Sequence, residues 1–537
     1  MKPPKYTEYL VIVLVSAIFC FALVLRLIPL RSNTPFWVDE FSTGTSARII
    51  LQQGLKIFLD KPPGFESNNS LTYALTAGSF VLFGQSESAA RVPSVIFGSL
   101  VVIAVYLLGR KLHSTTAGIL ASLFTATSYF QIVWSVQARS YMLLQLLTLL
   151  TIWWSVKMVE KPDTKLKDLI VLACLFILGM TTHFMFALCV LSVILVIIVS
   201  HRHKVIPYAI SRWYILISIV VLAIVALWQT GFINSLIAYA NSSFLLANNL
   251  WYYHPFLWRE YGLVVFTGVL GLVMMGRSAS KSLGIITLHL VLQLIFVTFF
   301  FGHHMSKYLL PIFPYFFIGM GIFLYEVSKV LVGNTGKIKL LKKYTLSTRV
   351  LTVAIASGLS LFIIANGHKF VLKPKAYYSL NHDFREISNI DYNQVYAIVK
   401  EKLAINSTEK VAMVDTWGGR TYWYLGEAYT PFYLLRWEDE EGFENGHLKK
   451  TAFQVDSNGE KYLTDTIGFV SEAKDIKKVM SRYSKGFLFV DDDTLPRSVI
   501  DFAEKNLKKE IVLDHYPLDD NPYSIWPATL YSWGFDK

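Results

Sequence analysis

Two adjacent carboxylates are the strongest chemical signal in this sequence. Asp39 and Glu40 follow an apolar segment, residues 9–30, that is long enough to cross a bilayer. A charge at the edge of a membrane is costly to desolvate, so an acid placed there is a candidate for a functional site. A carboxylate in this position is a suitable general base. The alternative is that both are interfacial acids in a hydrated loop.

Cationic and hydroxyl side chains occur where two other apolar segments begin. Arg139 can bind a phosphate through two parallel hydrogen bonds, or it is an interfacial arginine that only snorkels. Tyr141 offers a hydroxyl beside it, or packs as an interfacial aromatic residue. Lys307 and Tyr308 stand at the start of another segment on the same predicted side.

Three histidines lie near the same predicted face. His303 and His304 precede Lys307 and could bind a phosphate or a metal ion, or neither. His183 lies between two apolar segments and could line a cavity. No certain cofactor follows from these residues, and a divalent metal ion is left open.

The composition places these residues in a membrane protein. The 537 residues are 53% hydrophobic and 16% charged, whereas soluble domains are about 25% charged. Residues 1–365 contain 28 Lys and Arg against 11 Asp and Glu, and residues 366–537 contain 22 against 27. The positive excess therefore belongs to loops that flank the membrane and does not indicate nucleic acid. The sequence predicts a membrane domain over 1–365 and a soluble domain over 366–537.

Apolar runs of roughly span length predict about 11 transmembrane helices. They lie near residues 9–30, 92–109, 116–134, 140–158, 168–182, 184–200, 213–230, 261–275, 283–301, 308–328 and 348–365. Lys and Arg concentrate in the loops on one side, which places the N-terminus in the cytoplasm. An odd number of spans then puts the soluble domain outside the cytoplasm.

The first outer loop, residues 31–91, holds five of the 11 carboxylates of the membrane domain. Residues 42–58 and 71–83 are predicted to form amphipathic helices that lie on the membrane surface. The soluble domain has the pattern of an α/β fold. Its predicted elements are a helix at 395–403, a strand at 410–414, a turn at Gly418-Gly419, a strand at 486–490, a helix at 496–507 and a strand at 510–513.

Several segments, in this order, resemble the GT-C glycosyltransferases of the protein O-mannosyltransferase and aminoarabinose-transferase superfamily. They are Trp37-Val38-Asp39-Glu40, the run from Leu82 to Ser94, Trp134 to Tyr141, and His303 to Pro311. These enzymes take a sugar from a polyprenyl phosphate. The segment Glu66 to Tyr73 falls where the family has a His-Pro-Pro sequence, and Lys61-Pro62-Pro63 is a second candidate for that segment.

The resemblance implies a polytopic α-helical membrane protein of GT-C type with a C-terminal α/β extracytoplasmic domain. It implies inverting transfer of one sugar from an undecaprenyl- or dolichyl-type phosphate to a glycan, lipid or protein acceptor. The expected location is the plasma (inner) membrane, with no role for nucleic acid. It also assigns roles to residues: catalysis to Asp39 and Glu40, with Asp39 as the base; donor phosphate binding to Arg139, Tyr141, Lys307, Tyr308 and His304; and substrate binding to Glu66, Asn68, Asn69, His183 and His303.

The chain departs from the family pattern at two places. Lys307 stands where the family has Arg, which keeps the charge but not the planar fork. Asn68-Asn69-Ser70 replaces His-Pro-Pro, although amides and a hydroxyl can still bind a sugar. These departures leave open a non-catalytic protein that keeps the GT-C scaffold. A transporter is a further alternative, but the predicted spans are nearly free of mid-membrane acids.

Overall fold

The computed structural model describes most of the helical part of the chain and the core of the C-terminal domain. The described residues are 5–36, 38–54, 69–160, 166–200, 248–276, 280–302, 304–335, 348–374, 390–405, 410–416, 418–426, 429–434, 454–455, 461–462, 468–491, 495–515 and 526–535. They divide into two compact units. The first unit is Met1–Ser32 with Gln53–Lys375, and the second is Asn33–Gln52 with Ala376–Lys537.

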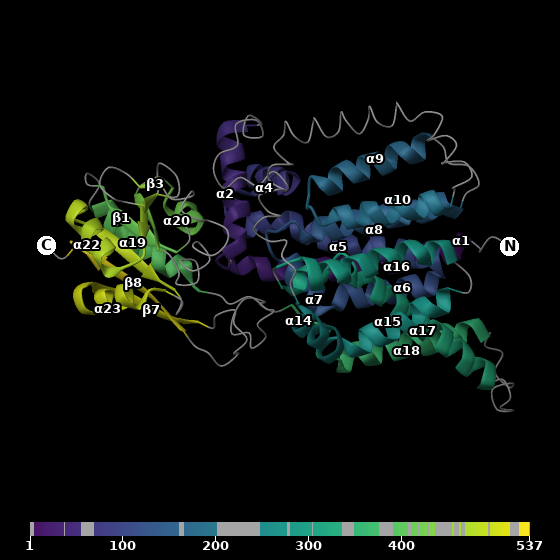
Figure 1. The fold of residues 1–537 in the computed structure, drawn as a ribbon. Helices are drawn as coiled ribbons and strands as arrows, with labels where there is room; N and C mark the ends of the chain where they lie inside the picture. Colours follow the sequence, from purple (N-terminus) through teal and green to yellow (C-terminus); the bar gives the residue numbers. More distant parts are fainter. Residues whose placement is uncertain are drawn as a thin grey trace, which may run out of the picture. The chain divides into compact units, whose positions relative to one another are not determined.

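The first unit is helical throughout its described residues (Figure 1). Its longer helices are α1 (Lys5–Leu27), α4 (Ser70–Phe83), α5 (Glu87–Leu112), α6 (Thr115–Thr127), α7 (Tyr129–Ser135), α8 (Tyr141–Glu160), α9 (Leu166–Met180), α10 (Phe186–Ser200), α14 (Leu250–Pro255), α15 (Gly262–Met275), α16 (Ser280–Ile295), α17 (Phe313–Thr335) and α18 (Thr348–Asn366). Short helical turns are η1 (Ile28–Ser32), η4 (Phe256–Glu260), η5 (Phe296–Phe300) and η6 (Ser306–Leu309).

The predicted spans coincide with helices wherever the chain is described. Span 116–134 is divided between α6 and α7, and span 213–230 lies outside the described residues. Among the described helices, six are long and apolar enough to cross a membrane, or seven if the pair Leu250–Glu260 and Gly262–Met275, bent by 87°, counts as one. The predicted number of crossings therefore stays a prediction.

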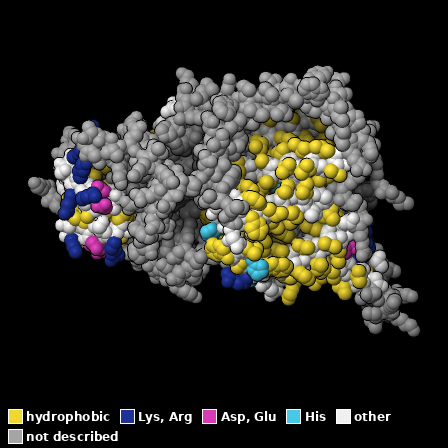
Figure 2. Space-filling model, viewed as in Figure 1, with side chains coloured by type: hydrophobic (Ala, Val, Ile, Leu, Met, Phe, Trp, Pro, Cys, Tyr) yellow, Lys and Arg dark blue, Asp and Glu magenta, His cyan; other side chains and the backbone are white. Residues whose placement is uncertain are grey.

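The outer surface of the helical unit suits contact with lipid. Figure 2 shows hydrophobic side chains over much of the described surface on the face in view. Leu10, Leu82 and Val273 are among the large apolar side chains that are more than half exposed. Exposed apolar surface of this extent is costly in water but not in a bilayer.

Buried polar contacts and small residues fix the helices to one another. Arg26, near the end of α1, is fully buried, and its guanidinium donates to Ser135 Oγ at 3.1 Å and to Ala126 O at 3.1 Å. A Cβ on Gly271 of α15 would clash with Gly319 of α17, so glycine permits this close approach. Both features rigidify the bundle that carries the polar residues described below.

The second unit contains an eight-stranded sheet in its described residues, with strand order β3-β4-β5-β2-β1-β6-β8-β7. The strands are β1 (Ala412–Asp415), β2 (Thr430–Leu434), β3 (Gln454–Val455), β4 (Lys461–Tyr462), β5 (Gly468–Val470), β6 (Gly486–Val490), β7 (Lys508–His515) and β8 (Trp526–Trp533). Strands β5, β2, β1 and β6 are parallel, and antiparallel strands extend the sheet on both sides. The helices of this unit are α2 (Val38–Gln53), α19 (Tyr392–Ile405), α20 (Gly418–Leu425), α22 (Ala473–Arg482) and α23 (Arg497–Asn506).

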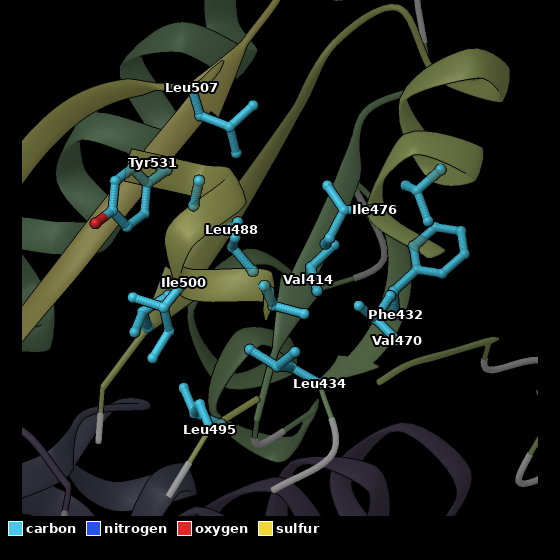
Figure 3. Packing of buried hydrophobic residues seen from close by; sticks show 14 of the residues in the cluster. Val414, Phe432, Leu434, Val470, Ile476, Leu488, Leu495, Ile500, Leu507 and Tyr531 are labelled. Carbon is cyan, nitrogen blue, oxygen red and sulfur yellow. The ribbon is translucent and has the colours of Figure 1, made fainter. Parts of the chain in front are cut away.

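Helices α22 and α23 cover one face of the sheet and enclose its core. Ile476 of α22 and Ile500 of α23 pack with Val414, Leu434 and Leu488 of the strands (Figure 3). The predicted strand 486–490 and helix 496–507 correspond to β6 and α23. The α/β fold of this domain is thus confirmed, whereas the domain boundary at 365 stays a prediction beside the observed division at Lys375.

Two local predictions were wrong. Helix α2 begins at Val38, four residues before the predicted start at 42, so Asp39 and Glu40 lie in its first turn rather than in a loop. Negative charge is favoured there by the helix dipole. Gly418-Gly419 opens α20 and does not form a turn.

Helix α2 also belongs to a different unit from the one expected. Residues Asn33–Gln52 cluster with the C-terminal domain, although the sequence placed the first outer loop with the membrane domain. The reason is aromatic packing within the second unit, where Phe36 lies 4.8 Å from Trp423 between ring centroids.

Candidate functional site

Lys307 lies among aromatic rings. Its side chain, on η6, is 3% exposed. The Nζ atom lies 5.9 Å from the ring centroid of Trp134 and 5.5 Å from those of Tyr141 and Tyr308. These distances fall within the range of cation–π attraction, which favours a desolvated ammonium by about 2 kcal/mol. The ring faces therefore stabilise the buried ammonium of Lys307.

Two glutamines hold the backbone next to Lys307. Gln293 of α16 donates from Nε2 to Tyr308 O at 2.8 Å, and Gln145 of α8 donates to Leu310 O. Both glutamines are fully buried in otherwise apolar helices. An amide buried there is costly unless it is hydrogen-bonded, so these two contacts fix η6 to α8 and α16.

His183 lies in the turn between α9 and α10 and joins the same cluster. Its ring is 5.3 Å from that of Tyr141 and is stacked on Phe184 at 4.7 Å. Burial, and next the charges of Arg139 and Lys307, lower the pKa of His183 to about 3. The imidazole is therefore neutral at physiological pH. Met185 N donates to Nδ1 at 3.2 Å, so the proton is assigned to Nε2.

Arg139 occupies the turn between α7 and α8, and its main chain is fixed. Ser94 of α5 donates from Oγ to Arg139 O at 2.9 Å, and Arg139 N donates to Gln137 O at 2.8 Å. The side chain is partly buried. Its positive charge contributes to the lowered pKa of His183. We define the Lys307 cluster as Lys307, Trp134, Tyr141, Tyr308, His183 and Arg139.

The predicted catalytic carboxylates lie in the first turn of α2, in the second unit. The side chain of Glu40 is fully buried, so Glu40 is not the solvated neighbour that one interpretation of the sequence allowed. The side chain of Asp39 lies outside the described residues. A buried carboxylate in a first helical turn is well placed to fix the orientation of the residues around it.

Of the three predicted substrate-binding residues in this segment, Glu66, Asn68 and Asn69, only Asn69 lies within the described part of the chain. Asn69 is buried and immediately precedes α4. Leu71 N donates to Thr181 O at 3.2 Å, which joins the start of α4 to the turn that carries His183. Glu66 and Asn68 lie outside the described residues.

His304 is separate from the rings around Lys307. It is exposed, and its ring lies 4.7 Å from Trp251 and 5.3 Å from Tyr252. His303 lies outside the described residues. Within the described part of the chain, no group of three His, Cys, Asp or Glu side chains could hold a metal ion.

Solved structures resemble this chain over most of its length. ArnT from Cupriavidus metallidurans in the apo state matches with a TM-score of 0.59 and 12% identity, over 98% of both chains. The same protein bound to undecaprenyl phosphate matches with a TM-score of 0.58 and 11% identity, again over 98% of both chains. The archaeal oligosaccharyltransferase AglB from Archaeoglobus fulgidus, in complex with an inhibitory peptide and a dolichol-phosphate, matches with a TM-score of 0.50 and 10% identity, over 90% of this chain and 70% of that one.

The chain has the GT-C fold. It is a multi-pass membrane protein. Residues 68–228 also match the family described as dolichyl-phosphate-mannose-protein mannosyltransferase. No curated protein matches the chain by sequence. The resemblance and the fold class predicted from the sequence are confirmed.

The GT-C scaffold contains functional candidates that sequence reasoning did not select. Trp134, Gln145 and Gln293 all contribute to the Lys307 cluster or its support. The signal for the two glutamines was present, because a polar side chain inside an apolar span is rarely incidental. Trp134 lay within a family-like segment, but an aromatic residue near a membrane edge is not distinctive.

Proposed function

We propose that this GT-C protein transfers one sugar from an undecaprenyl- or dolichyl-type phosphate to an acceptor, with inversion at the anomeric carbon. The observation that carries the proposal is the Lys307 cluster, a buried ammonium among three rings with Arg139 and a neutral His183 nearby. Structures of similar fold bind undecaprenyl phosphate and a dolichol-phosphate, which supports the same class of donor here.

The reaction requires a base and a stabilised leaving group. We assign the base to Asp39, which takes the proton from the acceptor's nucleophilic atom as that atom forms a bond to the anomeric carbon. The bond between this carbon and the phosphate oxygen breaks, and the electron pair stays on the polyprenyl phosphate. Lys307 and Arg139 stabilise the negative charge that develops there. Attack opposite the phosphate inverts the anomeric carbon.

Other residues take supporting roles in this proposal. Glu40, which is buried, orients the first turn of α2. Tyr141 and Tyr308 supply ring faces to Lys307, and His304 remains a candidate phosphate ligand. The neutral His183 can donate its Nε2–H to a sugar or phosphate oxygen. Four further residues are proposed to bind substrate by resemblance alone. They are the buried Asn69 and, outside the described residues, Glu66, Asn68 and His303.

The proposed setting follows from the distribution of charged loops. The N-terminus lies in the cytoplasm, the domain over 366–537 lies outside it, and the acceptor is a glycan, lipid or protein at the outer face of the plasma membrane. A divalent metal ion is left open as an addition to the site.

A transfer assay on the purified protein tests the proposal. Wild type, Asp39→Asn and the matched control Asp501→Asn are supplied with a panel of polyprenyl-phosphate sugars and candidate acceptors. Asp501 lies on α23 and is about half exposed. We expect wild type and the control to release polyprenyl phosphate, and Asp39→Asn to be slower by about 100-fold or more, as for loss of a general base.

Two outcomes would contradict the proposal. Full turnover by folded Asp39→Asn would remove Asp39 as the base. Failure of wild type both to transfer a sugar and to bind any polyprenyl phosphate would favour a non-catalytic protein on the GT-C scaffold.

A further inference from the structure

Helix α2 is packed against α20 of the C-terminal domain by aromatic contacts. Phe36, just before α2, is 1% exposed and lies 4.8 Å from the indole of Trp423 between ring centroids. Phe41, in the first half of α2, lies 5.8 Å from Tyr392 and 5.9 Å from Tyr424. These contacts belong to one compact unit, so α2 is an integral part of this domain.

Arg48 adds a directional contact to this packing. Its guanidinium carbon lies 4.1 Å from the ring centroid of Trp423. Its Nη1 donates to Trp423 O at 2.8 Å and lies 3.5 Å from Tyr422 O. Both carbonyls are in the last turn of α20, where the helix dipole favours a cation, and Tyr422 O also accepts from Gly426 N at 2.9 Å. Arg48 therefore caps α20 and stacks on it at the same time.

Glycine at position 44 allows the two helices to approach. A Cβ there would lie 2.6 Å from Phe36 Cε2 and 3.1 Å from Trp423 Cζ3. Glu40, Gly44 and Arg48 are spaced four residues apart, so they share one face of α2. The face of α2 that contacts Trp423 thus also carries Glu40. Asp39 directly precedes Glu40 on the helix.

Helix α20 is itself fixed to the sheet. Arg420, in its first turn, is fully buried and donates from Nη1 to Asp491 Oδ2 at 2.7 Å and from Nε to Asp415 Oδ2 at 3.3 Å. Asp415 ends β1 and Asp491 follows β6, the neighbouring parallel strand. Tyr396 of α19 also donates to Asp415, at 2.8 Å. Burial lowers the pKa of Arg420, but the two aspartates outweigh it and hold that pKa well above its usual value.

We propose that Arg48 and Trp423 are positioning residues, through which the C-terminal domain fixes the rotation of α2 and hence the orientation of Asp39 and Glu40. The sheet holds α20 through Arg420, and α20 holds α2 through Trp423. This inference rests on the proposed function, because it assigns the domain a role in the reaction that Asp39 serves. Arg48 and Trp423 touch neither donor nor acceptor in this account.

Kinetics of the full-length protein test the inference. We compare wild type with Arg48→Ala, Arg48→Lys, Trp423→Ala, Trp423→Phe and the control Arg497→Ala, whose side chain is 74% exposed on α23. We measure kcat and the donor KM, and the hydrogen exchange of the α2 amides over Val38–Gln53.

A misplaced base slows the chemical step more than donor binding, and a displacement of about 1 Å can cost about 100-fold. We therefore expect kcat to fall about 10- to 100-fold in Arg48→Ala and Trp423→Ala, with donor KM within about twofold. Exchange of the α2 amides should be at least about tenfold faster in both variants. Arg48→Lys and Trp423→Phe keep a cation and a ring, so they should recover much of kcat, and Arg497→Ala should match wild type.

Unchanged kcat in the two alanine variants would overturn the inference while leaving the proposed function standing. Equal losses in donor binding and kcat, without faster exchange in α2, would also overturn it. Absence of transfer and donor binding in wild type would instead overturn the proposed function.

Discussion

Two of the buried cations in the described part of the chain, Lys307 and Arg420, lie in contrasting surroundings. The Nζ atom of Lys307 lies 5.5–5.9 Å from the ring centroids of Trp134, Tyr141 and Tyr308. Arg420 is held by Asp415 and Asp491 and lies above the ring of Phe489 at 4.6 Å. Carboxylates and ring faces both stabilise a buried cation, the first by ion pairing and the second by cation–π attraction. We expect Arg420 to hold its domain together and Lys307 to contribute to donor binding, and the variants below compare the two roles.

Removal of Arg420 should give the largest effect. Arg420→Met leaves two buried carboxylates without their guanidinium, which typically costs about 3–5 kcal/mol of stability. We expect a large fall in the unfolding temperature of the full-length protein in detergent. Arg497→Met, at an exposed position, is the control. An unfolding temperature unchanged from wild type would show that the buried cluster does not stabilise the domain.

Lys307→Met should weaken donor binding and leave stability nearly unchanged, the opposite of what we expect for Arg420→Met. We expect polyprenyl phosphate to bind about 10- to 100-fold more weakly, or about 1.4–2.7 kcal/mol, with little change in unfolding temperature. Binding can be measured by titration with a fluorescent polyprenyl phosphate. A loss of stability as large as that of Arg420→Met, with donor affinity intact, would make Lys307 a structural residue and abolish the contrast.

The neutral His183 provides a smaller, pH-dependent effect. Its folded-state pKa of about 3 lies below the ordinary value of 6.5, so the unfolded chain takes up a proton that the folded chain does not. The stability contribution is therefore present above pH 6.5 and is lost as pH falls toward 3, by about 2 kcal/mol at pH 5. His183→Gln should remove this part of the pH dependence of unfolding, and His304→Gln, at an exposed ring, should not. Identical pH profiles for wild type and His183→Gln would contradict the assignment.

Removal of the Tyr141 ring should change donor binding by the smallest amount. Tyr141→Leu removes one face near Lys307 and should weaken donor binding by about 0.5–1 kcal/mol, while Tyr141→Phe keeps the face and should bind nearly as well as wild type. The same titration measures both variants. Equal losses in the two variants would indicate that the hydroxyl, and not the ring, contributes.

Local sequence patterns predicted some helices and strands of the fold and missed others. Apolar runs identified the long helices because burial in lipid requires uniform hydrophobicity over a span. Strand β6 was predicted because Gly486–Val490 is a continuous apolar run, whereas β2 and β8 contain Pro431 and Pro527, which obscure the strand pattern. Shorter strands carry too few residues to show a period.

Only part of the candidate site could likewise be predicted from the sequence. The sequence pointed to Arg139, Tyr141, Lys307 and His183. The structure places the ring of Tyr141 beside Lys307 and His183, and the roles of all four stay predictions. The sequence could not show that α2 belongs to the C-terminal domain, because Arg48 and Trp423 are 375 positions apart and neither stands in a distinctive motif. Such a contact depends on the tertiary arrangement of the whole unit.

The most direct measurement is the anomeric configuration of the transferred sugar. Wild type is incubated with a polyprenyl-phosphate sugar of known configuration and its acceptor, the product is analysed by NMR, and the released polyprenyl phosphate is quantified. The account predicts one inverted glycosidic bond for each polyprenyl phosphate released. Retention of configuration, or release of the lipid phosphate without a transferred sugar, would contradict it.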